Sequence, residues 1–552
     1  MARNGSARDS QFKSEMEQLL EQHDIFWGKK RKQLMEYRGA YTGEFWETLI
    51  GNSNGSMSLG GIRGIQTADA YKFIESYVSV LFLRQPGVQV TADAMTTGSP
   101  TAVESLANFW ISKQRRPFEN VTKLGLLYPQ AYLKMHIGDY DKKNVASKVT
   151  SIRAAAINPW DVVVDMDADS WEDMRYVAHI YWLPQPDAAR LYPNAKGMFK
   201  PTSKDDFFQR NSSKQPSGPT SDRFKFVKIV QFWDFQADKL IDFTFDVQGG
   251  WRVLKETDIP VRDSNDRPMS QLLPLIFSWK PDSPLEGISS MTHVIDQIYE
   301  KNKLRTQRMR TVDTNARKTL FKKDAFTPQA LNDLLSVQDG TFIGIDSEVP
   351  LGSLLAVVPT APLATDFDKH GAEVDADIRD ATALPANARG DVTGVTATEA
   401  GFVNSYAKNE IEKFNTEKGV LVQRAAHLFN RMLVTLLEDK DKFPVDVHGN
   451  LEIVTREKLQ GSFIYLNTDG NTNPIVMEQR KRDLIEIAPV LVSLGVPKEA
   501  IKEEIVRTWE LPKSFLAAEA PTANDPASQT TDAAQTESTV SAPSSELPQG
   551  DS

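Results

Sequence analysis

The sequence contains no cysteine among its 552 residues. This absence excludes disulfides, thiolate metal ligands and cysteine nucleophiles. No run of about 18 apolar residues occurs, so we expect no membrane-spanning helix. The histidines are scattered, with no pair at metal-binding helical spacing and no HExxH motif, so no zinc site is indicated.

A phosphate-binding loop is also missing. Gly55 and Gly60 have the spacing of such a loop, but Gly61 and Ile62 stand where the lysine and the hydroxyl residue should follow. Without these two side chains the loop cannot hold a nucleotide phosphate and its magnesium ion. The sequence therefore does not predict an ATPase.

The acidic stretch that begins at Asp165 starts like a calcium-binding loop. Its sixth position is Ser170 rather than glycine, and its twelfth is Tyr176 rather than glutamate. We interpret it as a β-turn with solvated aspartates.

The net charge is −10, from 64 basic and 74 acidic residues. An acidic net charge argues against a protein that coats nucleic acid, but it does not exclude a protein that lets nucleic acid slide past without sticking. Residues 301–323 carry nine basic residues and one acid, whereas residues 363–384 carry six acids and two bases. The two segments either pair with each other as oppositely charged helices, or form a basic surface for a partner or DNA beside an acidic face that repels phosphate.

Hydrophobic periodicity predicts an α+β protein. Short aromatic and β-branched runs between about 150 and 280 indicate an antiparallel β-rich module. Apolar residues at helical spacing occupy several longer segments. The predicted helices include 11–50, an apolar helix that begins at Ala70 and ends before Pro86, 102–136, 287–317, 363–384 and 397–440, and a small helical module is predicted at 475–510.

The helix at 397–440 is the longest, about 66 Å at about 1.5 Å per residue. Thr396 and Glu399 form a capping box at its start, because the hydroxyl accepts a free backbone N–H and the glutamate reaches back to the cap. We therefore interpret Glu399 as a helix cap rather than a catalyst, and Gly419 as a bend.

Four segments in a fixed order carry a resemblance to a known family. They are YKFIESYVSVLFLRQPGVQV (71–90), INPWDVVVDMDADSWEDMRYVAHIYWLP (157–184), PLEGISSMTHVIDQIYEKNKLRTQRMR (284–310) and GVTATEAGFVNSYAKNEIEKF (394–414). In this order and spacing the chain resembles the bacteriophage portal proteins, or head-to-tail connectors, of the podovirus type. The likeness covers roughly residues 15–515.

The resemblance implies a portal fold with long stem and wing helices, a β-rich wing module, a small α/β clip and a helical crown. Its implied segments are the wing (1–286), the first stem helix (287–317), the clip (318–362), the second stem helix (363–384), the tunnel loop (385–396), the long helix and strands of the wing (397–472) and the crown (473–515). Beyond them we expect a disordered tail (516–552). The tail lacks aromatic, lysine and arginine residues, which independently favours disorder.

The resemblance also implies a structural role. The chain would form a ring of about twelve subunits at one capsid vertex, closed by head-to-tail contacts. Double-stranded DNA would pass through the channel without sequence-specific binding, driven by the terminase large subunit, and leave at ejection. The other implied partners are the major capsid, scaffolding and head–tail adaptor or neck proteins. The protein would reside in the virion, and in the host cytoplasm during assembly, with no catalytic site, no cofactor, no metal and no membrane.

Particular residues follow from the resemblance. The DNA-facing tunnel loop would present Asn387, Arg389, Asp391 and Gly394. The clip residues Lys322, Lys323 and Asp324 would dock terminase or neck proteins. Two alternatives remain open at this stage: a metal-dependent nuclease, whose carboxylates no spacing singles out, and another capsid or tail structural protein.

Overall fold

The computed structural model describes residues 3–46, 64–83, 85–92, 98–195, 225–245, 250–314, 319–321, 355–357, 365–381, 397–447 and 450–468, with a few isolated positions besides. The chain divides into two compact units, Met1–Val476 and Met477–Ser552, and the elements named here belong to the first. Helices and antiparallel sheets are mixed, so the predicted α+β class is confirmed. Among the described residues, none of the helices has the length and apolarity to cross a membrane.

The largest sheet has five antiparallel strands in sequence order. They are β4 (Val162–Val164), β5 (Tyr176–Pro184), β6 (Phe226–Asp234), β7 (Lys239–Phe245) and β8 (Trp251–Asp258). The longest pairing joins β5 and β6, from Tyr176 opposite Asp234 to Pro184 opposite Phe226. This sheet confirms the β-rich module predicted between about 150 and 280.

A second sheet has the strand order β3 (Ile152–Ile157), β2 (Ala131–Ile137), β9 (Leu272–Leu275). Strand β2 corrects the helix predicted over 102–136. That segment holds α4 (Pro100–Lys113) and α5 (Arg115–Leu127), after which Tyr128 is extended with φ −117° and ψ 164°. Pro129 follows and disfavours helix at the preceding residue, so the chain continues as a strand between β3 and β9.

Two N-terminal helices pack into the main core, α1 (Arg3–Thr42) and α3 (Asp69–Leu81). The apolar stripe predicted for the first of them is buried at Met16, Leu20, Trp27, Leu34 and Tyr37. Helix α3 buries Phe73, Tyr77 and neighbouring apolar side chains against the same core.

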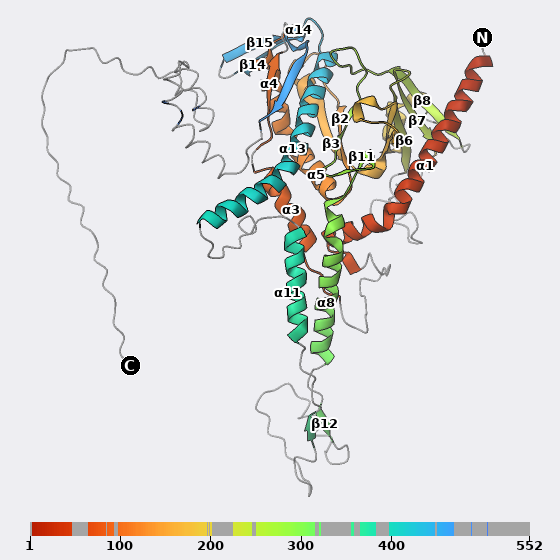
Figure 1. The fold of residues 1–552 in the computed structure, drawn as a ribbon. Helices are drawn as coiled ribbons and strands as arrows, with labels where there is room; N and C mark the ends of the chain where they lie inside the picture. The colour runs from red at the N-terminus through yellow and green to blue at the C-terminus, as the bar shows by residue number, and fades with distance from the viewer. Residues whose placement is uncertain are drawn as a thin grey trace, which may run out of the picture. The chain divides into compact units, whose positions relative to one another are not determined.

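The long helix predicted at 397–440 is α13 (Ala397–Leu436), which is bent along its length (Figure 1). Its second half runs through the core beside α3, α4 and β9. At Gly419 a Cβ would overlap the Asn467 amide, so a glycine here lets β16 approach the helix closely.

Two small antiparallel sheets border α13. Strand β1 (Val88–Ala92) pairs with β16 (Phe463–Asn467), and β14 (Lys442–Val447) pairs with β15 (Asn450–Thr455). The short helix α14 (Arg456–Leu459) connects β15 to β16. The other described elements are α6 (Val145–Ser151), α7 (Gln185–Leu191), β10 (Trp279–Lys280), β11 (Ser283–Gly287) and the 3-10 turns Pro159–Asp161, Trp171–Asp173, Pro193–Ala195 and Ser290–His293.

The last pair of helices is α8 (Ile295–Thr314) and α11 (Thr365–Ala381). They lie side by side in Figure 1 and contact each other along their lengths. Strand β12 (Thr319–Phe321) follows α8 and pairs antiparallel with β13 (Leu355–Val357), which precedes α11. Both helices were predicted. Helix α8 begins at Ile295, eight residues after the predicted start at 287, because the chain first completes strand β11 and the 3-10 turn Ser290–His293. The other predicted ends of the two helices lie outside the described residues.

Candidate functional site: the α8–α11 helix pair

The contact between α8 and α11 is made by small and apolar side chains. Val374 and Ile378 of α11 are buried, with 2% and 7% of their surface exposed. Gly371, one turn earlier, lies opposite Leu304 of α8, and a Cβ at this glycine would be 3.4 Å from the leucine Cδ2. The steps of three and four residues place these positions on one face of α11. The two helices therefore share a narrow apolar seam.

Ion pairs flank this seam. Lys301 Nζ lies 2.5 Å from Asp375 Oδ1 and 2.9 Å from Asp69 Oδ2 at the start of α3. His370 Nε2 lies 2.8 Å from Glu300 Oε1. The predicted pairing of the basic helix with the acidic helix is therefore confirmed at Lys301 and Asp375.

The first half of α8 is fixed to the main core by buried polar contacts. Asn302 is fully buried, and its Oδ1 accepts hydrogen bonds from the Thr67 backbone N–H at 2.8 Å and from the Thr67 hydroxyl at 2.9 Å. Thr306 Oγ1 accepts a hydrogen bond from the Ile65 N–H at 3.0 Å. These bonds hold the helix pair by its α8 member to the segment before α3.

The outer surface of the pair is charged. Glu373, Asp377 and Asp380 of α11 are exposed, and their spacing of four and three residues aligns them along one side of the helix. We call these three residues the acidic stripe. On α8, Lys303 and Arg305 are exposed. Like charges at this spacing destabilise an isolated helix by about 0.2–0.5 kcal/mol per pair, so the stripe is not explained by the stability of α11.

Most of the residues predicted for the site lie outside the described part of the chain. Glu399 falls in the first turn of α13, where the structure describes the backbone but not this side chain. The roles proposed for all of them remain predictions. The residues outside the described ranges are Lys322, Lys323, Asp324, Asn387, Arg389, Asp391, Gly394 and Thr396.

The calcium-like stretch is a paired turn. Asp165 is fully buried rather than solvated, which corrects the expectation for this residue. Its carboxylate accepts hydrogen bonds from Arg175 Nε at 2.7 Å and Nη2 at 2.6 Å. The Arg175 guanidinium holds the pKa of Asp165 below its usual value. Within the described ranges no group of three or more histidine and acidic side chains is arranged to hold a metal ion.

A partly buried polar cluster lies between the two larger sheets, and the sequence did not reveal it. Lys134 Nζ of β2 is 2.8 Å from His179 Nδ1 of β5 and 2.8 Å from Gln231 Oε1 of β6. Burial lowers the pKa of Lys134 to about 7 and, with help from Lys134, lowers the pKa of His179 well below its usual value. On β7, burial raises the pKa of Asp242, which accepts a hydrogen bond from the Tyr192 hydroxyl at 2.8 Å.

This cluster has the ingredients of acid–base chemistry, but its geometry is that of a bridge between sheets. Lys134 Nζ lies 4.9 Å from the Tyr181 ring centroid and 5.7 Å from that of Trp233. Aromatic rings therefore cover the ammonium group. The low pKa of Lys134 is a consequence of this cover, since a charged amine is costly away from water.

The sequence matches no protein-family model, and a comparison with curated proteins gives no match either. The function proposed for this chain therefore rests on the order of its segments, on the geometry of the helix pair and on the resemblance described above.

Proposed function

We propose that this chain is the subunit of a portal ring, the channel through which viral DNA enters and leaves a capsid. The observation that carries the proposal is the antiparallel pair α8–α11, with β12 and β13 paired between the two helices. The pair follows a β-rich module and precedes a 40-residue helix. This is the order that the portal resemblance implies for wing, stem, clip, stem and wing.

The charge of the helix pair suits a channel for DNA. Phosphate groups carry most of the affinity of proteins for DNA, so a channel that must let DNA slide needs few strong cationic contacts. The acidic stripe on α11 supplies repulsion, and a ring repeats it once per subunit. Arg389 of the proposed tunnel loop is the residue that we assign to phosphate contact, which would be independent of base sequence.

The partners follow from the same proposal. The large terminase subunit and later the neck proteins dock at the clip, where Lys322, Lys323 and Asp324 are the proposed contacts. The capsid and scaffolding proteins surround the wing. The ring acts without a cofactor, in the virion and, during assembly, in the host cytoplasm.

Electron microscopy of the purified full chain tests the proposal, with sedimentation velocity as the measure of subunit number. We expect rings with a central hole, of about twelve subunits. A chain that stays monomeric at every concentration, with or without scaffolding protein, would contradict the proposal. Cleavage of DNA that depends on a divalent metal would instead favour the nuclease alternative.

A further inference from the structure

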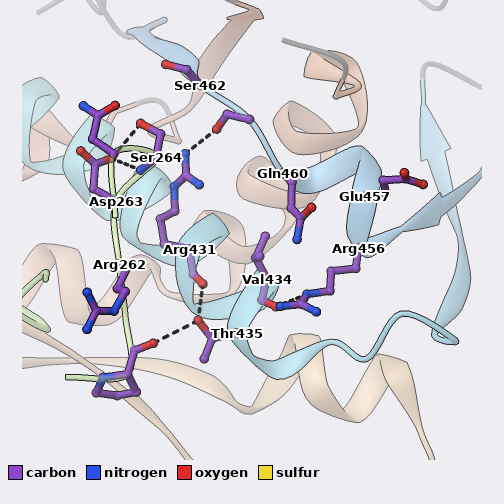
Figure 2. Close-up of a pocket in the computed structure, with 13 residues that line it drawn as sticks. Arg262, Asp263, Ser264, Arg431, Val434, Thr435, Arg456, Glu457, Gln460 and Ser462 are labelled. Atoms are coloured by element: carbon purple, nitrogen blue, oxygen red, sulfur yellow. Dashed lines mark hydrogen bonds between the residues drawn. The ribbon is translucent and has the colours of Figure 1, made fainter. Parts of the chain in front are cut away.

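A polar pocket of about 770 Å³ lies between three segments far apart in the sequence. The loop after β8 forms one wall, the C-terminal part of α13 the second, and the connection from α14 to β16 the third (Figure 2). The volume is in the usual range for small-molecule sites. Such sites are mostly apolar, whereas this pocket has only two apolar side chains in its lining. Its lining residues are Pro260, Arg262, Asp263, Ser264, Asn265, Arg431, Val434, Thr435, Arg456, Glu457, Gln460, Gly461 and Ser462.

Arg431 of α13 is the central feature of this pocket. Only 8% of the residue is exposed. Its Nε donates to His427 Nε2 at 3.3 Å, and its Nη2 donates to the Gly461 carbonyl. The carbonyl is neutral, and the imidazole must be neutral to accept from Arg431. Burial and Arg431 lower the pKa of His427, and they outweigh Asp263, whose Oδ1 lies 3.4 Å from the same Nε2 and raises it. Among the carboxylates that the structure describes, we find none in an ion pair with Arg431.

A buried guanidinium held only by neutral acceptors is costly unless an anion approaches it. The other two arginines of the pocket differ in this respect. Arg456 Nη1 donates to Asp439 Oδ1 at 2.9 Å, and its Nε donates to the Val434 carbonyl at 3.0 Å. Arg262 is paired with Asp238. Arg431 is therefore the cation of this pocket whose charge the described chain leaves least compensated.

We propose that this pocket binds a small free oxyanion, a phosphate or phosphoryl group, on the guanidinium of Arg431. A guanidinium has five N–H donors in a fork that matches such an anion. The described bonds of Arg431 use two of them. Figure 2 shows Gln460 in the same lining, where its amide adds a neutral donor, whereas the Ser264 hydroxyl already donates to Asp263 Oδ1 at 3.1 Å.

The composition of the pocket limits the class of ligand. The lining has three arginines against Asp263 and Glu457, a small positive excess that suits one compact anion. It contains no aromatic side chain on which a nucleobase would stack, so a phosphate or small organic phosphate fits better than a nucleotide base. This inference is independent of the portal proposal, because it involves neither α8 nor α11.

Titration of the full chain with inorganic phosphate tests the site, by isothermal calorimetry and by the shift in Tm, at ionic strength held constant with sodium chloride. We expect saturable binding and a Tm that rises with phosphate concentration as a ligand of the native state requires. Arg431→Gln should raise the Kd for phosphate at least about tenfold, because charge-assisted hydrogen bonds are the strong ones. The matched control is Arg190→Gln on α7, an exposed arginine beside Asp187, which should leave the Kd unchanged.

A second variant keeps the test decisive if Arg431→Gln fails to fold. Gln460→Glu adds a carboxylate to the lining without removing the arginine, and should abolish the phosphate response while preserving the fold. The proposal is overturned if the wild-type chain shows no saturable response, or if either folded variant binds phosphate as tightly as wild type. If duplex DNA competes with inorganic phosphate for the site, and this competition is lost in Arg431→Gln, the ligand is a DNA phosphate rather than a free oxyanion. This result would also overturn the proposal.

Discussion

Lys301 of α8 lies 2.5 Å from Asp375 of α11, and the same ammonium group lies 2.9 Å from Asp69 at the start of α3. One side chain thus joins both members of the helix pair to the main core. Lys301 and Asp69 are mostly buried, with 16% and 20% of their side chains exposed, whereas Asp375 is 42% exposed. The contact with Asp69 is therefore less screened by water than the contact with Asp375.

Lys301→Met should lower the free energy of unfolding by about 1–2 kcal/mol, because it leaves Asp69 as a partly buried carboxylate without its cation. Asp375→Asn should cost less than about 1 kcal/mol, since this end of the contact is exposed. Urea denaturation followed by circular dichroism measures both. Lys303→Met, at an exposed position on the same helix, is the control and should have no measurable effect. Equal losses for Lys301→Met and Lys303→Met would show that the ion pairs contribute nothing.

Gly287→Ala should destabilise the protein by about 3 kcal/mol or more. A Cβ at this position would overlap the backbone carbonyl of Pro129, which cannot move away as a side chain can. Gly371→Ala, in the interior of α11, is the contrasting variant, because its Cβ would make an ordinary 3.4 Å contact with Leu304 of α8. It should stabilise the chain by about 0.5–1 kcal/mol through helix propensity. Thermal unfolding measures both: we expect a lower Tm for Gly287→Ala and a higher Tm for Gly371→Ala than for wild type.

The stability of the protein should depend on the ionisation of Lys134. Its pKa in the folded state is about 7, below the ordinary value of 10.5, so between these pH values the unfolded chain binds more protons than the folded chain. The free energy of unfolding contributed by this residue therefore rises with pH across that window, by at most about 1.4 kcal/mol per pH unit.

Lys134→Met removes this dependence. The advantage of the variant over wild type should be largest at about pH 7 and below, and should shrink steadily as the pH rises towards 10.5. Chemical denaturation at about pH 7 and about pH 9 measures this decrease. Lys143 is an exposed lysine in the loop after β2. Lys143→Met should leave the free energy of unfolding unchanged relative to wild type at both pH values. A difference between Lys134→Met and wild type that does not change with pH would mean that Lys134 keeps an ordinary pKa.

If the chain forms the proposed ring, neutralising the acidic stripe should increase the affinity of the protein for DNA. The triple variant Glu373→Gln, Asp377→Asn and Asp380→Asn removes repulsion of phosphate, and the gain should shrink as salt is added. Filter binding of duplex DNA over a salt series measures it. The same variant should be more stable by a few tenths of a kcal/mol per removed like-charge pair.

The matched control for the stripe changes the same number of charges elsewhere. Asp139, Asp169 and Asp282 are exposed acids on loops, and their conversion to asparagine alters the net charge by the same amount. If this control increases DNA affinity as much as the stripe variant does, the change in net charge explains the gain. The result would then contradict a position of the acidic stripe next to DNA.

Periodicity was sufficient for much of the fold. Helices α1, α8, α11 and α13 were each predicted from apolar residues three or four apart, and the β-rich module from its aromatic and β-branched runs. Strand β2 was missed because its apolar residues continue the run of α5, and only the extended Tyr128 before Pro129 separates them. A local pattern identifies an element when one face of it is buried, and it fails where two buried elements follow each other.

The polar sites could not be predicted in this way. Lys134 meets His179 and Gln231, which are 45 and 97 residues away, and the pocket around Arg431 is assembled from three distant segments. A lysine or arginine in an alternating strand or helix has the same local sequence whether it is solvated or buried. Its role is set by which elements pack against it, which the sequence pattern does not contain. The proposed roles of Lys322, Lys323 and Arg389 remain predictions.

The pairing of β1 with β16 has a consequence for how the chain is made. Val88 lies opposite Asn467 and Ala92 opposite Phe463, so this sheet closes a loop of almost the whole first unit. Contacts between residues so distant in sequence form late and slow the folding reaction. The buried ion pair of Lys148 Nζ with Asp441 Oδ2, 2.6 Å apart, also joins residues distant in the sequence, so it too forms late. On the ribosome, therefore, the N-terminal helices emerge long before strand β16, and we expect the first unit to complete its fold only after synthesis has passed residue 467.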